Sequence, residues 1–576
     1  MFDHVIRGAT LVDGTGAPAR TADVGLRGGR VAAVAGPGTL DGPGEDATGL
    51  VLAPGFVDPH THYDAQLFWD PYATPSMNHG VTTVAGGNCG FTLAPLHPGR
   101  PEDADYTRRM MAKVEGMSLV ALEEGAPWTW HTFGDYLDAL EGRIAVNAGF
   151  MVGHCALRRY VMGAGAVAGP ATGDQVEAMV RLLRDAMDAG AWGLSTTRST
   201  THSDGDGQPV ASRHADPEEL LALCRAVGDH EGTQIEAIVS GCLDRFADEE
   251  IDLLVELSAV AGRPLNWNVL TIDAAVPERV PRQLVPSERA RKAGGRIVAL
   301  TMPILTPMNM SLGTFCALNL IPGWGDVLGL PVAERIARLR DPAVRREMLR
   351  RADSDEAGIF RRLARFDRYV VGDTYSAANE GLTGRVVGDI AAERGQDPFQ
   401  CLVEICAGDD LRTVLWPMPA DNDAASWALR AETWRHEDVL LGGSDAGAHL
   451  DRMCGAPYTT RFLGDCLRGR RLAGLEDAVR MLTDDPARLF GLRERGRVAE
   501  GYHADLVLFD PERIDAGPAT LVRDLPGDSP RLDSRAVGIV SVRVNGVETV
   551  RDDAVTGAVP GRVLRSGRDT TTVSTR

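Results

Sequence analysis

Eight short runs of apolar residues, most of them rich in valine and isoleucine, constrain the fold of this chain more than any other feature. A buried parallel strand is apolar on both faces, and each parallel pair needs a long crossover, usually a helix. Eight strands separated by helical segments predict an α/β fold of the (β/α)8 TIM-barrel class. The runs span residues 50–62, 80–90, 144–154, 191–197, 233–240, 264–271, 295–302 and 438–445.

Helical patterns fill most of the segments between these runs. Residues 174–190 repeat apolar side chains at the spacing of one helix face, and Gly190 ends the pattern. Asp216 is a typical N-cap residue, and Pro217 suits the first turn of the helix that follows. The chain therefore alternates strand and helix through its middle part.

The two ends of the chain have a different pattern. Residues 1–54 and 492–560 contain short runs that alternate apolar and polar side chains and turn at glycine. The pair Asn545-Gly546 between valines is a strong signal for a two-residue hairpin. We predict that both ends combine into one small β-sandwich domain.

The remaining boundaries follow from the spacing of the runs. Residues 55–491 would form the barrel, and the long gap after the seventh run predicts an insertion at about 303–437. Residues 561–576, rich in threonine near the end, are expected to form a loose tail.

The charge balance restricts the partners of this chain. Sixty lysines and arginines against 80 acidic residues give a net charge of −20, which disfavours nucleic acid and anionic membranes. Nine cysteines without a CxxC pair do not suggest a disulfide framework. The uncharged stretch Ile297–Gly325 is long enough to span a bilayer, but its prolines and asparagines argue against this. We expect a cytoplasmic protein that binds a small-molecule substrate, and a homo-oligomer stays open.

The sequence His60-Thr61-His62 gives the sharpest chemical signal. Barrel enzymes place reactive groups at the carboxyl ends of their strands, and residues two apart on an extended strand share a face. Two imidazoles on one face can bind one divalent metal. The alternative is a pair of solvated loop histidines, but the apolar run before them favours the metal site.

Several segments resemble one known family. LVLAPGFVDPHTHYD resembles the first-strand signature of the amidohydrolase superfamily, and GRVAEGYHADLVLFDPERI resembles its C-terminal β segment. GVTTVAGGNCGF, FMVGHCALR and LLGGSDAGAH are similar to the N-acyl-D-amino-acid deacylase (D-aminoacylase) branch. The resemblance implies a metal-dependent hydrolase of amide-type C–N bonds, acting on an N-acyl-D-amino acid or a related acylated small molecule.

The resemblance also implies roles for single residues. His60 and His62 match the pair that holds one metal, and Asp445 matches the residue that ligates metal and takes a proton from the attacking water. Cys89 matches the zinc-ligating cysteine of this branch. The alternative for Cys89 is a small buried thiol among glycines. The implied cofactor is a divalent metal, expected to be zinc, with one or two ions per chain.

The chain departs from that family at the second metal position. D-aminoacylases contribute one histidine from strand five and one from strand six, and both are missing here. Glu236 could ligate as a carboxylate, whereas Asn266 or Asn268 offers only a neutral oxygen, which is weak for zinc. Any second metal should therefore bind weakly.

Other polar residues near the predicted strand ends are candidates for substrate binding. The alternatives are that His154 is hydrogen-bonded beneath the site and that the arginines pair with acidic side chains. His202 is expected to be solvated in a polar loop. The substrate-binding candidates are Tyr63, Asp64, His154, Arg158, Arg198, Asn268, Tyr375 and His449.

Two functions of different classes remain open on the sequence. The first is the metal-dependent hydrolase, with His60, His62 and Asp445 as the minimum site. The second is a metal-poor barrel that only binds a small ligand or runs a non-hydrolytic reaction, because a fold alone does not determine a function.

Overall fold

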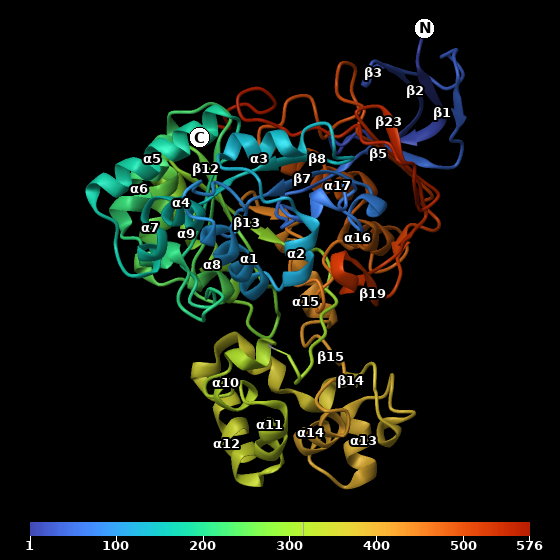
Figure 1. Cartoon of the computed structure of the whole chain (residues 1–576). Coiled ribbons are helices and arrows are strands. Elements are labelled where there is room, and N and C mark those ends of the chain that lie inside the picture. The colour runs from blue at the N-terminus through green and yellow to red at the C-terminus, as the bar shows by residue number, and fades with distance from the viewer. Residues whose placement is uncertain (315, 576) are drawn as a thin grey trace. The chain divides into compact units, whose positions relative to one another are not determined.

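The structure is a computed structural model that describes residues 1–314 and 316–575 (Figure 1). It is an α/β protein with two compact units. The first unit comprises Met1–Thr306 together with the chain from Ala425 onward, and the second is Pro307–Ala424. Each unit has its own buried core.

The first unit contains two parallel sheets, ordered β6-β7-β8 and β16-β13-β12-β11-β10-β9. Every neighbouring pair in them is parallel. Only Met151 separates β8 from β9, and a parallel bridge joins Thr61, after β6, to Ala446, after β16. The strands are β6 (Phe56–Asp58), β7 (Val81–Gly86), β8 (Asn147–Phe150), β9 (Val152–Gly153), β10 (Gly193–Thr197), β11 (Gln234–Ile238), β12 (Pro264–Trp267), β13 (Arg296–Thr301) and β16 (Val439–Leu441).

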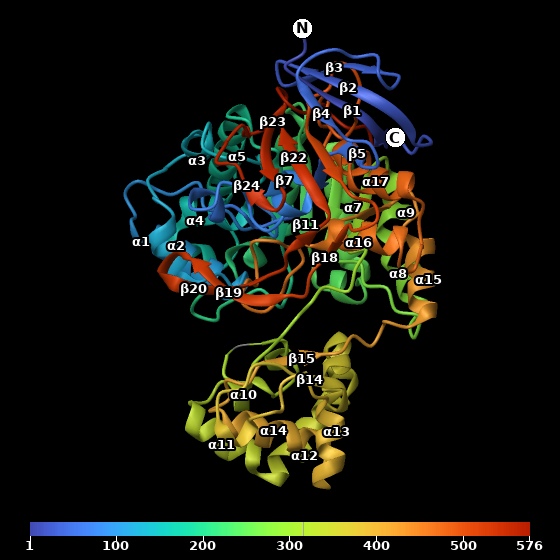
Figure 2. The same ribbon diagram turned by 90° about the vertical axis from the view of Figure 1, so that its right-hand side faces the viewer.

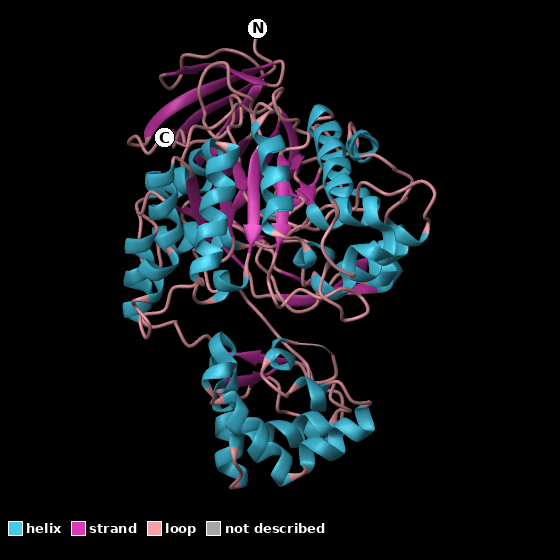
Figure 3. Ribbon diagram, turned by 90° about the vertical axis from the view of Figure 1, so that its left-hand side faces the viewer, coloured by secondary structure: helices cyan, strands magenta, loops and turns pink. Residues whose placement is uncertain are grey.

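Helices flank these strands (Figure 3). The two helices predicted from the sequence are confirmed as α5 (Gly173–Asp188) and α6 (Pro217–Gly228), and the Asp216 side chain accepts from the Glu219 N–H at 2.9 Å. The others of this unit are α1 (Glu102–Val114), α2 (Leu119–Gly125), α3 (Phe133–Leu140), α4 (His154–Met162), α7 (Asp248–Ala261), α8 (Arg279–Gln283), α9 (Val285–Ala293), α15 (Ala424–Thr433), α16 (Tyr458–Leu467), α17 (Leu475–Leu482) and α18 (Asp484–Leu489).

Strands from both ends of the chain share one nine-stranded sheet, ordered β24-β23-β22-β17-β5-β1-β2-β3, with β4 beside β1 (Figure 2). Asn545 and Gly546 have φ of 48° and 82° and connect β22 to β23, which confirms the predicted hairpin. The strands are β1 (His4–Leu11), β2 (Arg20–Arg27), β3 (Arg30–Ala35), β4 (Gly44–Asp46), β5 (Val51–Pro54), β17 (Leu506–Phe509), β22 (Ile539–Val544), β23 (Val547–Arg551) and β24 (Ala554–Val555).

The first apolar run serves two sheets. β5 pairs antiparallel with β17, whereas β6 pairs parallel with β7. Gly55 separates them, and a Cβ atom there would lie 2.2 Å from Thr82. The run therefore changes sheets at a position that only glycine accommodates.

The segment after residue 560 is not a loose tail, contrary to the sequence prediction. Val563 and Leu564 are fully buried, and Val563 forms a parallel bridge with Ala148 of β8. The Leu564 N–H donates to the Ala148 carbonyl at 2.8 Å. Two apolar residues and one strand edge hold this segment against the parallel strands.

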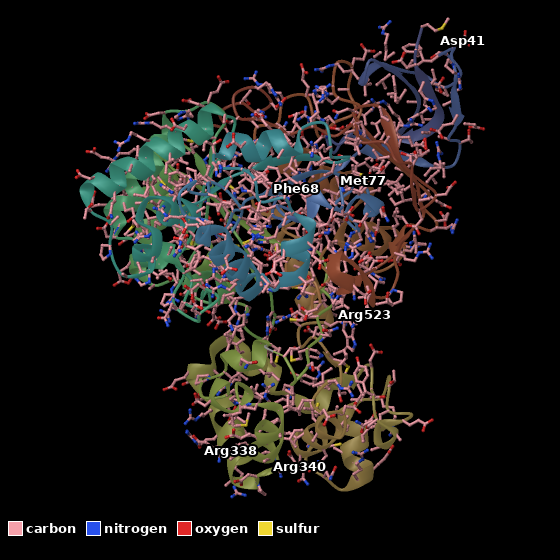
Figure 4. All side chains as sticks on the ribbon, in the orientation of Figure 1. Asp41, Phe68, Met77, Arg338, Arg340 and Arg523 are labelled. Carbon is pink, nitrogen blue, oxygen red and sulfur yellow. The ribbon has the colours of Figure 1, made fainter. Side chains whose placement is uncertain are left out.

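The described part of the second unit packs helices around an aromatic core. Phe366 stacks on Phe399 with ring centroids 4.5 Å apart, and Trp324 lies 5.4 Å from Phe399. Figure 4 labels Arg338 and Arg340 on one of these helices. Its elements are α10 (Gly325–Leu328), α11 (Val332–Arg340), α12 (Pro342–Ala352), β14 (Tyr369–Val371), α13 (Val387–Arg394), α14 (Pro398–Gly408) and β15 (Leu415–Pro417).

Within the described residues, no helix is long and apolar enough to cross a membrane. The uncharged stretch from Ile297 begins within the buried strand β13, and its described part farther along the chain includes the short 3-10 helix Ala317–Leu320.

Candidate metal centre

His60 and His62 lie directly after β6, and both are fully buried. Their ring centroids are 5.4 Å apart. The His62 N–H donates to the Ala446 carbonyl at 2.7 Å, and the Thr61 N–H donates to the Ala85 carbonyl at 2.9 Å. Neighbouring strand ends thus hold the backbone of the pair on both sides.

Asp445 reaches the same point from the end of β16. Its N–H donates to the His60 carbonyl, and its Oδ1 lies 3.7 Å from His60 Nε2 and 3.2 Å from His62 Nε2. Burial opposes ionisation of this carboxyl, but the hydrogen bond and charge of His62 hold its pKa well below the usual range. Asp445 is therefore ionised, as a metal ligand or a base must be.

Cys89 approaches His60 from the end of β7, with Sγ 3.5 Å from His60 Nε2. Its φ of 56° lies in the left-handed region, which turns the chain sharply between Gly87 and Gly90. Burial, followed by the charge of Glu236, raises the pKa of the thiol. A bound cation would favour the thiolate instead.

Glu236, on β11, lies behind Cys89. Its Oε2 accepts from the Cys89 N–H at 2.9 Å and from Ser195 Oγ at 2.6 Å, while its buried Oε1 has no hydrogen-bond partner among the described residues. Asn266, on the next strand, and Asn268, directly after it, also each have a buried Oδ1 without such a partner. Burial raises the pKa of Glu236 to about 7.

This donor set fits a divalent cation. Zn–N and Zn–O bonds of about 2.0–2.1 Å at tetrahedral angles place ligand atoms about 3.3 Å apart, and slightly farther when one ligand is sulfur. The distances of 3.2, 3.5 and 3.7 Å among His60, His62, Asp445 and Cys89 are close to that spacing. The sets His60–His62–Cys89 and His62–Glu115–Asp445 both bring their ligand atoms within 4.8 Å of one another.

The sequence reasoning missed two residues at this site. Glu115 follows α1, and its Oε2 lies 3.5 Å from His62 Nε2. His202 was expected to be solvated. Instead, burial, together with the charges of His449 and His62, lowers its pKa to about 3. Its Nδ1 is 2.9 Å from Thr197 Oγ1, and its ring lies against Phe91. No strand or helix pattern marks either residue, since both lie in connecting segments.

His154 and Arg158 lie in a separate buried network. His154 Nε2 is 2.8 Å from Glu219 Oε1, its Nδ1 is 2.9 Å from Thr196 Oγ1, and Arg158 contacts the other oxygen of Glu219. Arg158 also donates to the Gly169 carbonyl at 2.6 Å. Both ring nitrogens of His154 are thus hydrogen-bonded, as in the alternative to substrate binding that the sequence left open.

Tyr63 and Asp64 follow the histidine pair directly, and their side chains have different partners. The Tyr63 hydroxyl is 2.6 Å from Ser76 Oγ within the core. Asp64 Oδ2 accepts from the Gly87 N–H at 3.3 Å, and burial raises its pKa to about 6 although the charge of His62 opposes this. Asp64 thus adds negative charge beside His62.

The remaining candidates occupy varied positions. Arg198 donates to the Ala215 carbonyl at 2.5 Å. His449 lies in a turn rather than a helix, with Nε2 3.8 Å from Asp445 Oδ2. Tyr375 belongs to the second unit, where its side chain is half-exposed under the Arg412 guanidinium.

A histidine pair after the first parallel strand and an aspartate after the last converge in an α/β fold, as expected for a metal-dependent hydrolase. The chain belongs to the amidohydrolase family, whose model matches residues 44–556, and within it to the D-aminoacylase branch. It is 31% identical over 575 residues to a D-aminoacylase of Alcaligenes xylosoxydans xylosoxydans, covering 98% of this chain and 97% of that relative.

Solved structures agree with this placement. A crystal structure of D-aminoacylase superposes with a TM-score of 0.65 at 29% identity, covering 98% of this chain and 100% of that one. The N-acyl-D-glutamate deacylase of Bordetella bronchiseptica, solved with zinc and a phosphonate mimic of the tetrahedral intermediate, gives 0.65 at 25% identity over the same shares.

Proposed function

We propose that this protein hydrolyses the amide-type C–N bond of an N-acyl-D-amino acid or a closely related acylated small molecule. The observation that carries the proposal is the convergence of His60, His62 and Asp445, with separations of 3.7 and 3.2 Å to the aspartate oxygen. Relatives that act on acylated D-amino acids, aligned over nearly the whole chain, support the substrate class.

The proposed architecture is a (β/α)8 barrel with a β-sandwich built from both chain ends. The parallel order of the strands and the bridge from Thr61 to Ala446 support closure of the barrel. In this architecture residues 1–54 and 492–560 form the sandwich, 55–491 the barrel, and about 303–437 the insertion. The metal site lies where such barrels carry their reactive groups.

We further propose zinc as the divalent metal, held by His60, His62 and Asp445 with Cys89 beside them. Such a cation polarises a carbonyl oxygen and lowers the pKa of water toward neutrality. The second position, offered Glu236 and an asparagine in place of two histidines, should hold a metal weakly. The nitrogen and sulfur donors favour zinc over magnesium or calcium.

The protein's own groups supply the proton transfer. Asp445 is held ionised by its surroundings, so its carboxylate can accept a proton from the attacking water and return it to the leaving amine. The His60 carbonyl and the Ser444 hydroxyl fix the Asp445–Ala446 backbone, the second of them by accepting from the Ala446 N–H at 3.0 Å. The base is thereby oriented before substrate arrives.

Among the substrate-binding candidates from the sequence, we propose that those nearest the metal ligands, His449 and Asn268, contact the substrate. His449 and Asn268 lie beside Asp445 and His60, since a Cβ on Gly443 would be 3.1 Å from Asn268 Oδ1 and 3.5 Å from His60 Cβ. His202 adds a neutral imidazole to the same region. The cytoplasmic location and the homo-oligomer stay predictions from the sequence.

The test is a hydrolysis assay on the full chain after zinc reconstitution. N-acetyl-D-amino acids with acidic, apolar and amide side chains, and their L-enantiomers, are the probes. We expect release of free amino acid from at least one D-substrate and much slower release from its L-enantiomer. Full zinc occupancy with no hydrolysis of any N-acyl amino acid would refute the proposal and favour the ligand-binding alternative.

A further inference from the structure

We propose that Glu115 is an additional carboxylate ligand of the metal centre, contributed by the loop after α1 rather than by a strand end. The inference rests on the proposed function, because it concerns the same cation. It gives the site a negatively charged oxygen on the His62 side, opposite to the Cys89 sulfur on the His60 side.

The geometry places the Glu115 carboxylate at ligand distance. Its Oε2 lies 3.5 Å from His62 Nε2, and the ligand atoms of His62, Glu115 and Asp445 all fall within 4.8 Å of one another. Two ligand atoms on one zinc ion are separated by about 3.3 Å. Glu115 therefore lies no farther from His62 than Cys89 lies from His60.

The second carboxylate oxygen of Glu115 is buried. Glu115 is 3% exposed, and its Oε1 has no hydrogen-bond partner among the described residues. Asp445 Oδ1 lies 3.2 Å from the same His62 Nε2 that Glu115 Oε2 approaches. Two carboxylates thus meet at one buried imidazole nitrogen, and a cation bound among these three groups would stabilise them.

Backbone hydrogen bonds connect Glu115 to α1 and to the segment after Asp445. The Glu115 N–H caps α1 by donating to the Met111 carbonyl at 2.9 Å, and the Glu115 carbonyl accepts from the His449 N–H. Gly116 follows with φ of +59°, and a Cβ there would lie 3.2 Å from His449 Cα. The close packing on the segment after Asp445 holds Glu115 in place, as a ligand requires.

The test compares zinc binding by the parent, Glu115→Gln and the control Glu123→Gln, an exposed glutamate of α2. Apparent zinc affinity is measured by competition with a chromophoric chelator, and Co²⁺ absorption reports the ligand set. We expect Glu115→Gln to bind zinc about 10-fold or more weakly and to alter the Co²⁺ spectrum, while Glu123→Gln matches the parent. Glu115→Asp, which retains charge but shortens the side chain, should also bind more weakly and serves if Glu115→Gln does not fold.

The outcomes separate this inference from the proposed function. If the parent binds zinc and hydrolyses substrate, but the folded Glu115 variants match its zinc affinity and Co²⁺ spectrum, Glu115 is not a ligand and the hydrolase proposal survives. If the parent itself binds no zinc, both proposals fail. Weaker zinc binding with an altered spectrum supports the ligand.

Discussion

Two clusters in this molecule each combine buried histidine with a carboxylate, but they differ in their hydrogen bonding. In the cluster around His154, the imidazole and the Arg158 guanidinium share Glu219, and both ring nitrogens are engaged. In the cluster around His62, Nδ1 of both His60 and His62 and Oε1 of Glu115 lack a hydrogen-bond partner among the described residues. Burial is complete for all three histidines.

The difference teaches that burial beside a carboxylate does not by itself mark a ligand. Two cationic or donor groups around one Glu219 form a satisfied network. Around His62, by contrast, three carboxylates act on one imidazole, an arrangement that a bound cation would stabilise. Unpartnered buried polar atoms therefore distinguish the candidate metal centre from the cluster around His154.

Removing a metal histidine should have the largest effect on activity. We expect His60→Ala or His62→Ala to lose most of the metal and nearly all turnover, because two imidazoles share one ion. The fold should persist, as neither side chain packs in the apolar core. Metal content by elemental analysis, turnover and circular dichroism are the measurements. Full metal occupancy with parental turnover in either variant would refute the assignment.

Asp445→Asn should cost about 10²–10⁴ in turnover, the usual effect of losing a general base. The amide retains the shape and one oxygen donor, so metal and substrate should still bind. In the parent, activity should fall on the acidic side as Asp445 takes up a proton. Steady-state kinetics with metal analysis measure both effects, and turnover equal to the parent would exclude Asp445 as the base.

Glu219→Ala should act on stability instead of on metal binding. It would leave Arg158 and His154 buried without their carboxylate, at a cost of about 3–5 kcal/mol in the free energy of unfolding. Glu218→Ala, an exposed neighbour on α6, is the control and should change little. Denaturant unfolding measures the stability and elemental analysis the metal. Loss of metal from a folded Glu219→Ala would mean that the two clusters are not separate.

His79 should give the smallest effect. It is a buried histidine whose two ring nitrogens have hydrogen-bond partners, neither of them a carboxylate. Its ring nitrogens lie 2.6 Å from Thr460 Oγ1 and 2.7 Å from the Ser534 carbonyl, and burial lowers its pKa to about 4. The unfolded chain binds this proton near pH 6.5, so stability should fall as the pH decreases from about 6.5 to 4, by up to about 3 kcal/mol. Unfolding of the parent and His79→Gln across this range measures the effect. An identical pH dependence in both would exclude His79 as its source.

Local patterns predicted much of the candidate centre. His60 and His62 are two residues apart after an apolar run, and Asp445 and Cys89 follow other runs, so a parallel strand arrangement brings them together. The helices α5 and α6 and the hairpin at Asn545-Gly546 also follow from short-range signals. Neighbouring residues determine strand ends, helix caps and tight turns, and therefore the sequence by itself determined these features.

The tertiary structure alone decided the position of Glu115 and His202, which lie in connecting segments without periodicity. It also decided that Glu219, on α6, would occupy both His154 and Arg158, and that Val563 and Leu564 would pack on the parallel strands. The contacts of Glu115 with His62, of Glu219 with His154 and Arg158, and of Val563 with Ala148 each join residues far apart in the chain. Which distant groups meet depends on the packing of whole helices and loops, and no local pattern encodes that packing.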